Sequence, residues 1–391
     1  MKIIPYGYHF VDNKDRLNLA KSLSGKYLTG GNLNIKFEKK LKKTLGSKYL
    51  TVCNSGTSAL HLAFLALGLK KNDTIIMPAV NFISSYNMAS IIGAKIYLAD
   101  VDAVTGQMTP INVEQCIKNY NLKKIKIILT MYLGGSPKNI FEFYRLKKKY
   151  KCFLVEDSCH ALGAHYMHNN KKYFIGSNAH SDISTFSFHP VKGVTTGEGG
   201  CISVASKSVY KKILEIKNHG ILRNDKKHWD YDVNVNGFNY RISDLNCALG
   251  IGQLNKLKKF NSYRNKVAKL YKNKLKTISN YLTTPIHEKN IYSSYHLFVI
   301  SINFDNLKKN KDFFLDYMLK KKIMCQFHYK PIYYFKIYKN KKINLKMYNG
   351  TENYYNNCLS VPIYYKIGNK KIGYVVKQIC NFINKYKKKL V

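Results

Sequence analysis

The residues best suited to chemistry lie in three short segments that are far apart in the chain. The stretch NSGT at residues 54–57 starts a predicted helix, and the N–H groups at the positive end of a helix bind anions. Asp157 ends the apolar run FLVED, with His160 three residues later. Lys192 follows Ser187 in TFSFHPVKGVTTGEGG, where small and aromatic neighbours favour a partly desolvated, nucleophilic amine.

Each segment alone has an ordinary interpretation, as a helix start, a structural Asp–His pair or a lysine in a surface turn. Together they predict a site for pyridoxal phosphate (PLP). That cofactor needs an anion cradle for its phosphate, a carboxylate against its pyridine nitrogen and a lysine for a Schiff base. The three parts occur in that order, with 35 positions from Asp157 to Lys192.

Strands and helices alternate around these segments. YLTVC at 49–53 is predicted to be a strand that leads into a helix, with Asn54 and Ser55 as candidate N-caps and Gly68 as its end. Apolar runs such as DTIIMPAV, AKIYLADVD, KIKIILTMY and CFLVED alternate with helical patterns. The pattern indicates an α/β fold with a large, mainly parallel sheet, in which ligands bind beyond the carboxyl ends of the strands.

The pattern changes near residue 255. A long lysine-rich helical segment is followed by the strand-like run SSYHLFVISINF and by FFLDYMLKKKIMCQFHYKP. We therefore expect a large PLP-binding domain with an N-terminal arm at residues 1–255 and a smaller α+β domain at residues 256–391.

Composition excludes several classes of protein. The 391 residues are 45% hydrophobic, but no apolar run is long enough to span a membrane. The N-terminal stretch matches neither a signal peptide nor a transit peptide, so the cytoplasm is expected. The nine cysteines are scattered without a CxxC pair, which favours a reducing compartment and argues against a disulfide framework or a metal site.

The formal charge of +43 raises the alternative of a nucleic-acid-binding protein. The lysines are spread along the whole chain, however, and no nucleic-acid-binding motif accompanies them. Compositional drift is the simpler interpretation, and the charge can still help to attract anionic substrates.

Several motifs carry a family resemblance. The segment SFHPVKGVTTGEGG resembles the lysine segment of the DegT/DnrJ/StrS sugar-nucleotide aminotransferases. Other segments of that family are similar to VEDSCHALGA, CNSGTSALHLAFLALG, NYRISDLNCALGIGQL and YLTGGNLNIKFE. The matches run from residue 6 to about residue 365, and the chain is identified as a member. The resemblance implies PLP fold type I, as in aspartate aminotransferase.

The resemblance also implies roles for individual residues. Lys192 is expected to form the Schiff base and shuttle the proton, while Asp157 pairs with the pyridine nitrogen. Phe82, which the sequence alone would place in the core, is expected to stack on the ring, with His160 near the ring hydroxyl. The phosphate is expected to bind Gly56, Thr57 and Ser187, together with Asn239 from a neighbouring subunit. A homodimer with shared active sites follows from that last contact.

The stretch QFHYKPIY at 326–333 resembles aminotransferases of the pseudaminic acid pathway, with Tyr333 where the wider family often has histidine. The implied reaction moves an amino group from glutamate to C4 of a UDP-linked 4-keto-6-deoxy-N-acetylhexosamine and releases 2-oxoglutarate. Gly56 is a departure, since that subfamily can carry alanine there, and we expect the cradle to remain intact. The expected substrate-binding residues are Tyr6, Lys26, Tyr27, Leu28, Thr29, Gln326, Phe327, His328 and Tyr329.

Three alternatives remain. The substrate could be another nucleotide-linked keto sugar, of the GDP-perosamine or bacillosamine type. PLP-dependent dehydration is disfavoured because Lys192 is present. A non-catalytic nucleic-acid-binding protein is disfavoured by the intact set of Asp157, Ser187, Lys192 and Asn239.

Overall fold

A seven-stranded sheet forms the centre of the computed structural model, which describes all residues except 1, 225, 228, 287, 339–342 and 389–391. The strands lie in the order β1 (Tyr49–Cys53), β9 (Gly200–Val204), β8 (Ile183–Ser187), β5 (Phe153–Asp157), β4 (Ile127–Met131), β2 (Thr74–Pro78) and β3 (Lys95–Ala99). Only β9 runs against the others in this sheet. The predicted α/β fold of type I, with a large, mainly parallel sheet, is confirmed.

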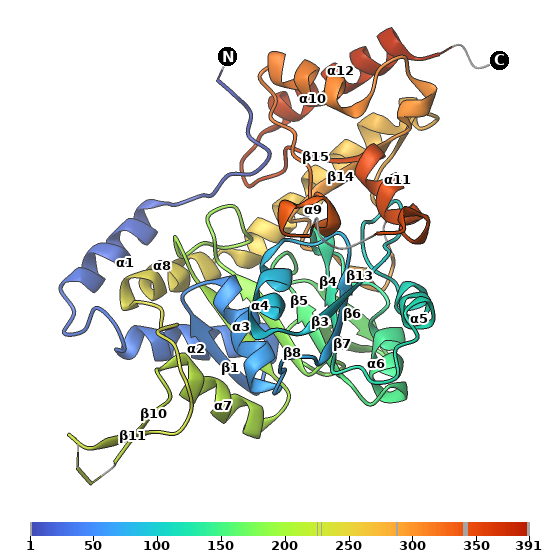
Figure 1. Ribbon diagram of the computed structural model, residues 1–391. Helices are drawn as coiled ribbons and strands as arrows, with labels where there is room; N and C mark the ends of the chain where they lie inside the picture. The colour runs from blue at the N-terminus through green and yellow to red at the C-terminus, as the bar shows by residue number, and fades with distance from the viewer. Residues whose placement is uncertain (1, 225, 228, 287, 339–342, 389–391) are drawn as a thin grey trace.

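Helices cover both faces of this sheet (Figure 1). Alternate residues of each strand point to opposite faces, so Ile75 and Met77 join one core cluster while Ile76 joins another. One face packs on α3 (Gly56–Ala66), α4 (Ser84–Ile92) and α7 (Lys207–Lys217). The other packs on α2 (Asn32–Leu45), α5 (Pro110–Asn119) and α6 (Ile140–Lys149).

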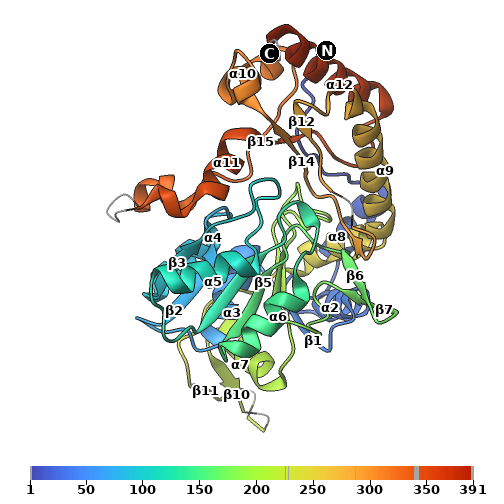
Figure 2. The same cartoon turned by 90° about the vertical axis from the view of Figure 1, so that its right-hand side faces the viewer.

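The C-terminal part forms its own layered unit (Figure 2). Its sheet has the order β12 (Leu282–Thr283), β14 (Phe298–Ile302) and β15 (Cys358–Val361). Three helices pack against it: α9 (Leu257–Leu275), α10 (Lys311–Lys320) and α12 (Asn369–Tyr386). The expected boundary at residue 255 falls between α8 (Asp244–Leu254) and α9, and it stays a prediction.

Smaller elements lie outside the two main sheets. Strand β13 (Ile291–Tyr292) pairs with the hairpin of β6 (His165–His168) and β7 (Lys171–Phe174). The hairpin β10 (Ile221–Arg223) with β11 (Tyr231–Val233) projects away from the large sheet (Figure 1). Helix α1 (Asn13–Leu23) contacts α8, and α11 (Asn349–Asn357) precedes β15. No helix within the described ranges has the length and hydropathy needed to cross a membrane.

Candidate active site

The register of the central sheet brings the three chemical segments to one edge. Asp157, the last residue of β5, pairs with Thr185 on β8. Two residues later, Ser187 lies opposite Gly200 of β9, which in turn lies opposite Cys53 at the end of β1. Because β5, β8 and β1 run in the same direction, the segments that follow them meet at their carboxyl ends.

The N-terminus of α3 forms an anion cradle at this edge. The side chain of Ser55 is the N-cap and accepts the Ser58 N–H at 3.0 Å. Within the described residues, no acceptor binds the N–H groups of Gly56 and Thr57. A Cβ on Gly56 would lie 2.8 Å from the Cβ of Ser187, so glycine lets the helix start lie against β8.

Asp157 and Lys192 form the reactive part of the site. Asp157 is 2% exposed, and its Oδ1 accepts the Cys159 N–H at 3.2 Å. Burial raises the pKa of the Asp157 carboxyl, although Cys159 and Lys192 partly oppose this. Burial also lowers the pKa of the Lys192 amine, against the attraction of Cys159 and Asp157. A cationic N–H partner would stabilise this buried carboxylate, and a neutral amine is the form that acts as a nucleophile or base.

A cavity of about 440 Å³ joins these groups to the C-terminal part. Phe82 lines it with its side chain 50% exposed, so this residue is not the core aromatic that the sequence alone suggested. Its ring lies 5.6 Å from that of Tyr329. The predicted residues that line the cavity are Tyr6, Gly56, Thr57, Phe82, Asp157, Ser187, Lys192, Gln326, Phe327, His328 and Tyr329.

Other predicted residues lie elsewhere. His160 is buried behind the cavity, and its Nε2 lies 3.0 Å from the Tyr329 hydroxyl. The loop with Lys26, Tyr27, Leu28 and Thr29 is exposed and does not line the cavity of its own chain.

Asn239 is also exposed and outside this cavity, where its carbonyl accepts from the Asn54 side chain at 3.4 Å. Tyr333 does not line the cavity; it is buried in the core, and its hydroxyl donates to Glu352.

Sequence reasoning missed several lining residues, of which His296 is the most notable. It lies within the strand-like run SSYHLFV, and its ring centre is 4.2 Å from that of His160. Burial, with nearby His160, lowers the pKa of His296 well below its ordinary value. A single histidine before an apolar strand gave no signal of this position. The other missed lining residues are Ser84, Met131, Cys159, His189, Val191 and Glu198.

Comparison with known proteins shows the family. The sequence profile of the DegT/DnrJ/EryC1/StrS aminotransferase family matches residues 10–380. The chain belongs to this family. It is 35% identical over 387 residues to the UDP-4-amino-4,6-dideoxy-N-acetyl-beta-L-altrosamine transaminase of Campylobacter jejuni, covering 99% of both chains. It is 29% identical over 385 residues to the GDP-perosamine synthase of Escherichia coli O157:H7, covering 98% of this chain and 99% of that one.

A solved structure is also similar. Helicobacter pylori PseC, an aminotransferase involved in the biosynthesis of pseudoaminic acid, matches with a TM-score of 0.87 and 26% identity over 98% of this chain and 100% of that one. The chain is thus a PLP-dependent sugar aminotransferase.

The residues of the cavity fit PLP. The N–H groups of Gly56 and Thr57, without acceptors among the described residues, suit a phosphate. Buried Asp157 suits a protonated ring nitrogen, and the Lys192 amine suits a covalent bond to an aldehyde. No group of His, Cys, Asp and Glu side chains in the described ranges is arranged to hold a metal ion.

Proposed function

We propose that this enzyme transfers an amino group from glutamate to C4 of a UDP-linked 4-keto-6-deoxy-N-acetylhexosamine in the pseudaminic acid pathway or a related surface-glycan pathway. The observation that carries the proposal is the cavity that combines Asp157, Lys192 and the start of α3 with aromatic side chains from the C-terminal part. The 35% identity to the altrosamine transaminase supports this choice of sugar.

Each residue has a defined task in this reaction. PLP, when bound, supplies an electron sink for the pair of electrons left when a C–H bond is broken. Lys192 takes the α-proton of glutamate and later returns a proton to sugar C4, which its lowered pKa favours. Asp157 holds a proton on the ring nitrogen, because its buried carboxylate is stabilised by a cationic donor.

The cavity also has groups suited to a nucleotide sugar. The rings of Tyr6, Phe327 and Tyr329 offer apolar faces to the sugar and to the base of the nucleotide, while Phe82 is available to stack on the PLP ring. The positive charge of the chain attracts the diphosphate. We place the reaction in the cytoplasm, where nucleotide sugars are used.

We also propose a homodimer with shared active sites. Asn239 and the loop at residues 26–29 are exposed in one chain and outside its own cavity, which suits a contribution to the partner's site. The hairpin β10–β11 adds exposed apolar residues suited to an interface, namely Leu222, Trp229, Tyr231 and Val233.

The absorbance spectrum tests the proposal first. We expect the purified protein with PLP to show a yellow band that glutamate removes and that the UDP-linked keto sugar restores. Lys192→Ala should prevent the change while leaving the fold intact. A protein that stays colourless with PLP would refute the aminotransferase activity of this chain.

The GDP-perosamine type of substrate is the second candidate, supported by the 29% identity to the GDP-perosamine synthase. The same spectral assay separates the two. Recovery of the yellow band with a GDP-linked 4-keto sugar, and none with the UDP-linked one, favours the second candidate.

A further inference from the structure

A chain of hydrogen bonds runs from a backbone N–H to the wall of the cavity. The N–H of Gly134 lies 3.3 Å from Nδ1 of His160, and Nε2 of His160 lies 3.0 Å from the hydroxyl of Tyr329. His160 is 2% exposed and does not line the cavity, whereas Tyr329 does. Both ring nitrogens of His160 are therefore occupied by groups of the protein.

The first bond fixes the tautomer of His160. A backbone N–H can only donate, so Nδ1 must be the unprotonated nitrogen. Burial, followed by the charges of Lys192, His328 and Arg264, lowers the pKa of His160 well below its ordinary value, so the ring is neutral. A neutral ring with a bare Nδ1 carries its hydrogen on Nε2. That hydrogen points at the oxygen of Tyr329, which must accept it.

The hydroxyl hydrogen of Tyr329 is therefore directed away from His160. Burial raises the pKa of Tyr329 well above its ordinary value, so the hydroxyl keeps its proton. Among the described residues, His160 is the one hydrogen-bond partner of the Tyr329 hydroxyl, and Tyr329 lines the cavity, so we infer that its O–H is available to a group bound there. The titratable groups around this hydroxyl are Tyr6, Asp157, Cys159, His160 and His328.

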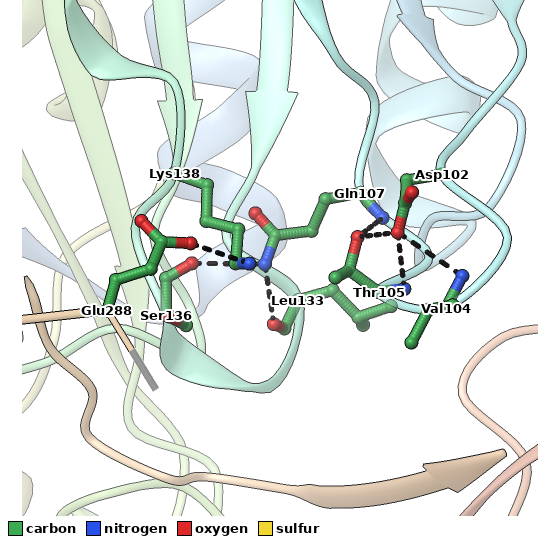
Figure 3. Close-up of polar contacts among 8 residues, drawn as sticks. All are labelled: Asp102, Val104, Thr105, Gln107, Leu133, Ser136, Lys138 and Glu288. Carbon is green, nitrogen blue, oxygen red and sulfur yellow. Dashed lines mark hydrogen bonds and ion pairs between the residues drawn. The ribbon is translucent and has the colours of Figure 1, made fainter. Parts of the chain in front are cut away.

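The turn that carries Gly134 is held from two sides. Figure 3 shows the side-chain amide of Gln107 against the turn, where it donates to the carbonyls of Leu133 at 3.1 Å and Ser136 at 3.0 Å. Gln107 is 5% exposed, and its own N–H donates to the Thr105 hydroxyl at 3.3 Å.

On the far side, Ser293 and Ser294 each donate to the carbonyl of Gly135 at 3.0 Å, the first through its hydroxyl and the second through its N–H. Gly134 itself has φ of +75°, a conformation that glycine adopts without strain. These contacts fix the direction of the Gly134 N–H.

We propose that Tyr329 donates a hydrogen bond to the oxygen of the ring hydroxyl of PLP. His160 and Gln107 are then positioning residues that set the direction of the Tyr329 O–H. This inference rests on the proposed function, and it differs from the expectation that His160 itself approaches the ring hydroxyl. A fixed donor of this kind stabilises negative charge on the oxygen that it faces.

The test compares variants loaded with PLP by absorbance as the pH is varied. Without the donor, negative charge on the ring oxygen is less stable, so the cofactor binds its proton more tightly. We expect Tyr329→Phe to raise the protonation midpoint of the yellow band by about one pH unit. This shift corresponds to the free energy of one hydrogen bond to a charged oxygen. We also expect PLP to bind this variant about tenfold more weakly.

Tyr354→Phe is the matched control. Its hydroxyl donates to the carbonyl of His328 at 2.7 Å, so it supports the same segment but does not line the cavity. Its midpoint should equal that of the wild type. An equal shift in both variants, or no shift in Tyr329→Phe, overturns the proposal.

The protein without PLP provides a second readout. Nitrogen NMR of labelled histidine, assigned with His160→Gln, should show the Nε2–H tautomer for His160. Gln107→Leu removes the amide that donates to the turn but keeps a side chain of similar size. We expect this variant to populate both tautomers of His160. Its protonation midpoint should rise by less than that of Tyr329→Phe. A wild-type His160 with its hydrogen on Nδ1 overturns the proposal.

The two proposals fail in different ways. A wild-type protein that never turns yellow with PLP refutes the proposed function and this contact together. A yellow, active wild type with an unmoved midpoint in Tyr329→Phe overturns the Tyr329 contact alone.

Discussion

Replacing Gly56 with alanine tests the close approach of α3 to β8, on which the anion cradle depends. The added Cβ would lie 2.8 Å from the Cβ of Ser187, 3.3 Å from its Cα and 3.4 Å from the Sγ of Cys159. The Ser187 atoms belong to the backbone and to the first side-chain carbon, so no rotamer change can move them. The start of α3 must therefore shift outward by roughly half an ångström.

Two opposing effects set the size of the change. Overpacking of this kind costs about 1–3 kcal/mol, while alanine in a helix is at most about 1 kcal/mol better than glycine. We expect the free energy of unfolding to fall by about 1–2 kcal/mol. The dissociation constant of PLP should rise about tenfold, because the N–H groups of residues 56 and 57 move away from the phosphate.

Urea unfolding followed by circular dichroism measures the first effect, and a PLP titration measures the second. Gly373→Ala in α12 is the control, because nothing lies within 4 Å of its Cβ, and it should stabilise the protein by about 0.5–1 kcal/mol. Adding Ser187→Gly removes the Cβ at 2.8 Å and should recover part of the stability lost in Gly56→Ala. Our reasoning is wrong if Gly56→Ala matches the wild type in both assays, or if the losses of the two substitutions simply add.

Four further predictions concern catalysis, pH and assembly. Asp157→Asn should still turn yellow with PLP but transaminate at least about 100-fold more slowly, as measured by 2-oxoglutarate release, because the ring nitrogen loses its charged partner. Burial lowers the pKa of His328 to about 3. In acid, the unfolded chain therefore binds a proton at His328 that the folded chain does not bind, and the free energy of unfolding falls as the pH drops below the pKa of the unfolded histidine. Between about pH 6 and pH 4, His328→Gln should reduce the slope of the free energy of unfolding against pH by about 1.4 kcal/mol per pH unit. Equal slopes in the variant and the wild type would contradict the lowered pKa of His328. Mixing inactive Lys192→Ala and Asn239→Ala homodimers should restore about a quarter of wild-type activity, since mixed dimers have one intact shared site. Trp229, the single tryptophan and 69% exposed in one chain, should shift its emission to the blue on dimerisation; an emission independent of concentration and of oligomeric state argues against its place in the interface.

Local sequence was sufficient to predict the framework of the site. The alternation of strand and helix and the Ser55 cap depend on neighbours within a few residues, and both occur in the structure. The segments NSGT, Asp157 and Lys192 could be recognised one by one from their local sequence, and they line one cavity. A strand followed by a turn must place its next side chains at the edge of the sheet. The three segments together predicted the cofactor, and the resemblance to a family then assigned roles to individual residues.

Tertiary structure decided what depends on contacts between distant segments. Gly56 meets Ser187 only because β1, β9 and β8 pair in one register, and that pairing is not encoded in either segment alone. Packing of the C-terminal part placed His296 and Tyr329 at the cavity, and it put Tyr333 in the core beside Glu352.

The same contacts gave His160 its two partners, Gly134 and Tyr329, and so removed it from the cavity wall. Spacing along the chain limits which residues reach an edge of the sheet. The direction of the His160–Tyr329 hydrogen bond depends on packing between separate segments, because Gly134 lies 26 residues from His160 and Tyr329 lies 169 residues from it.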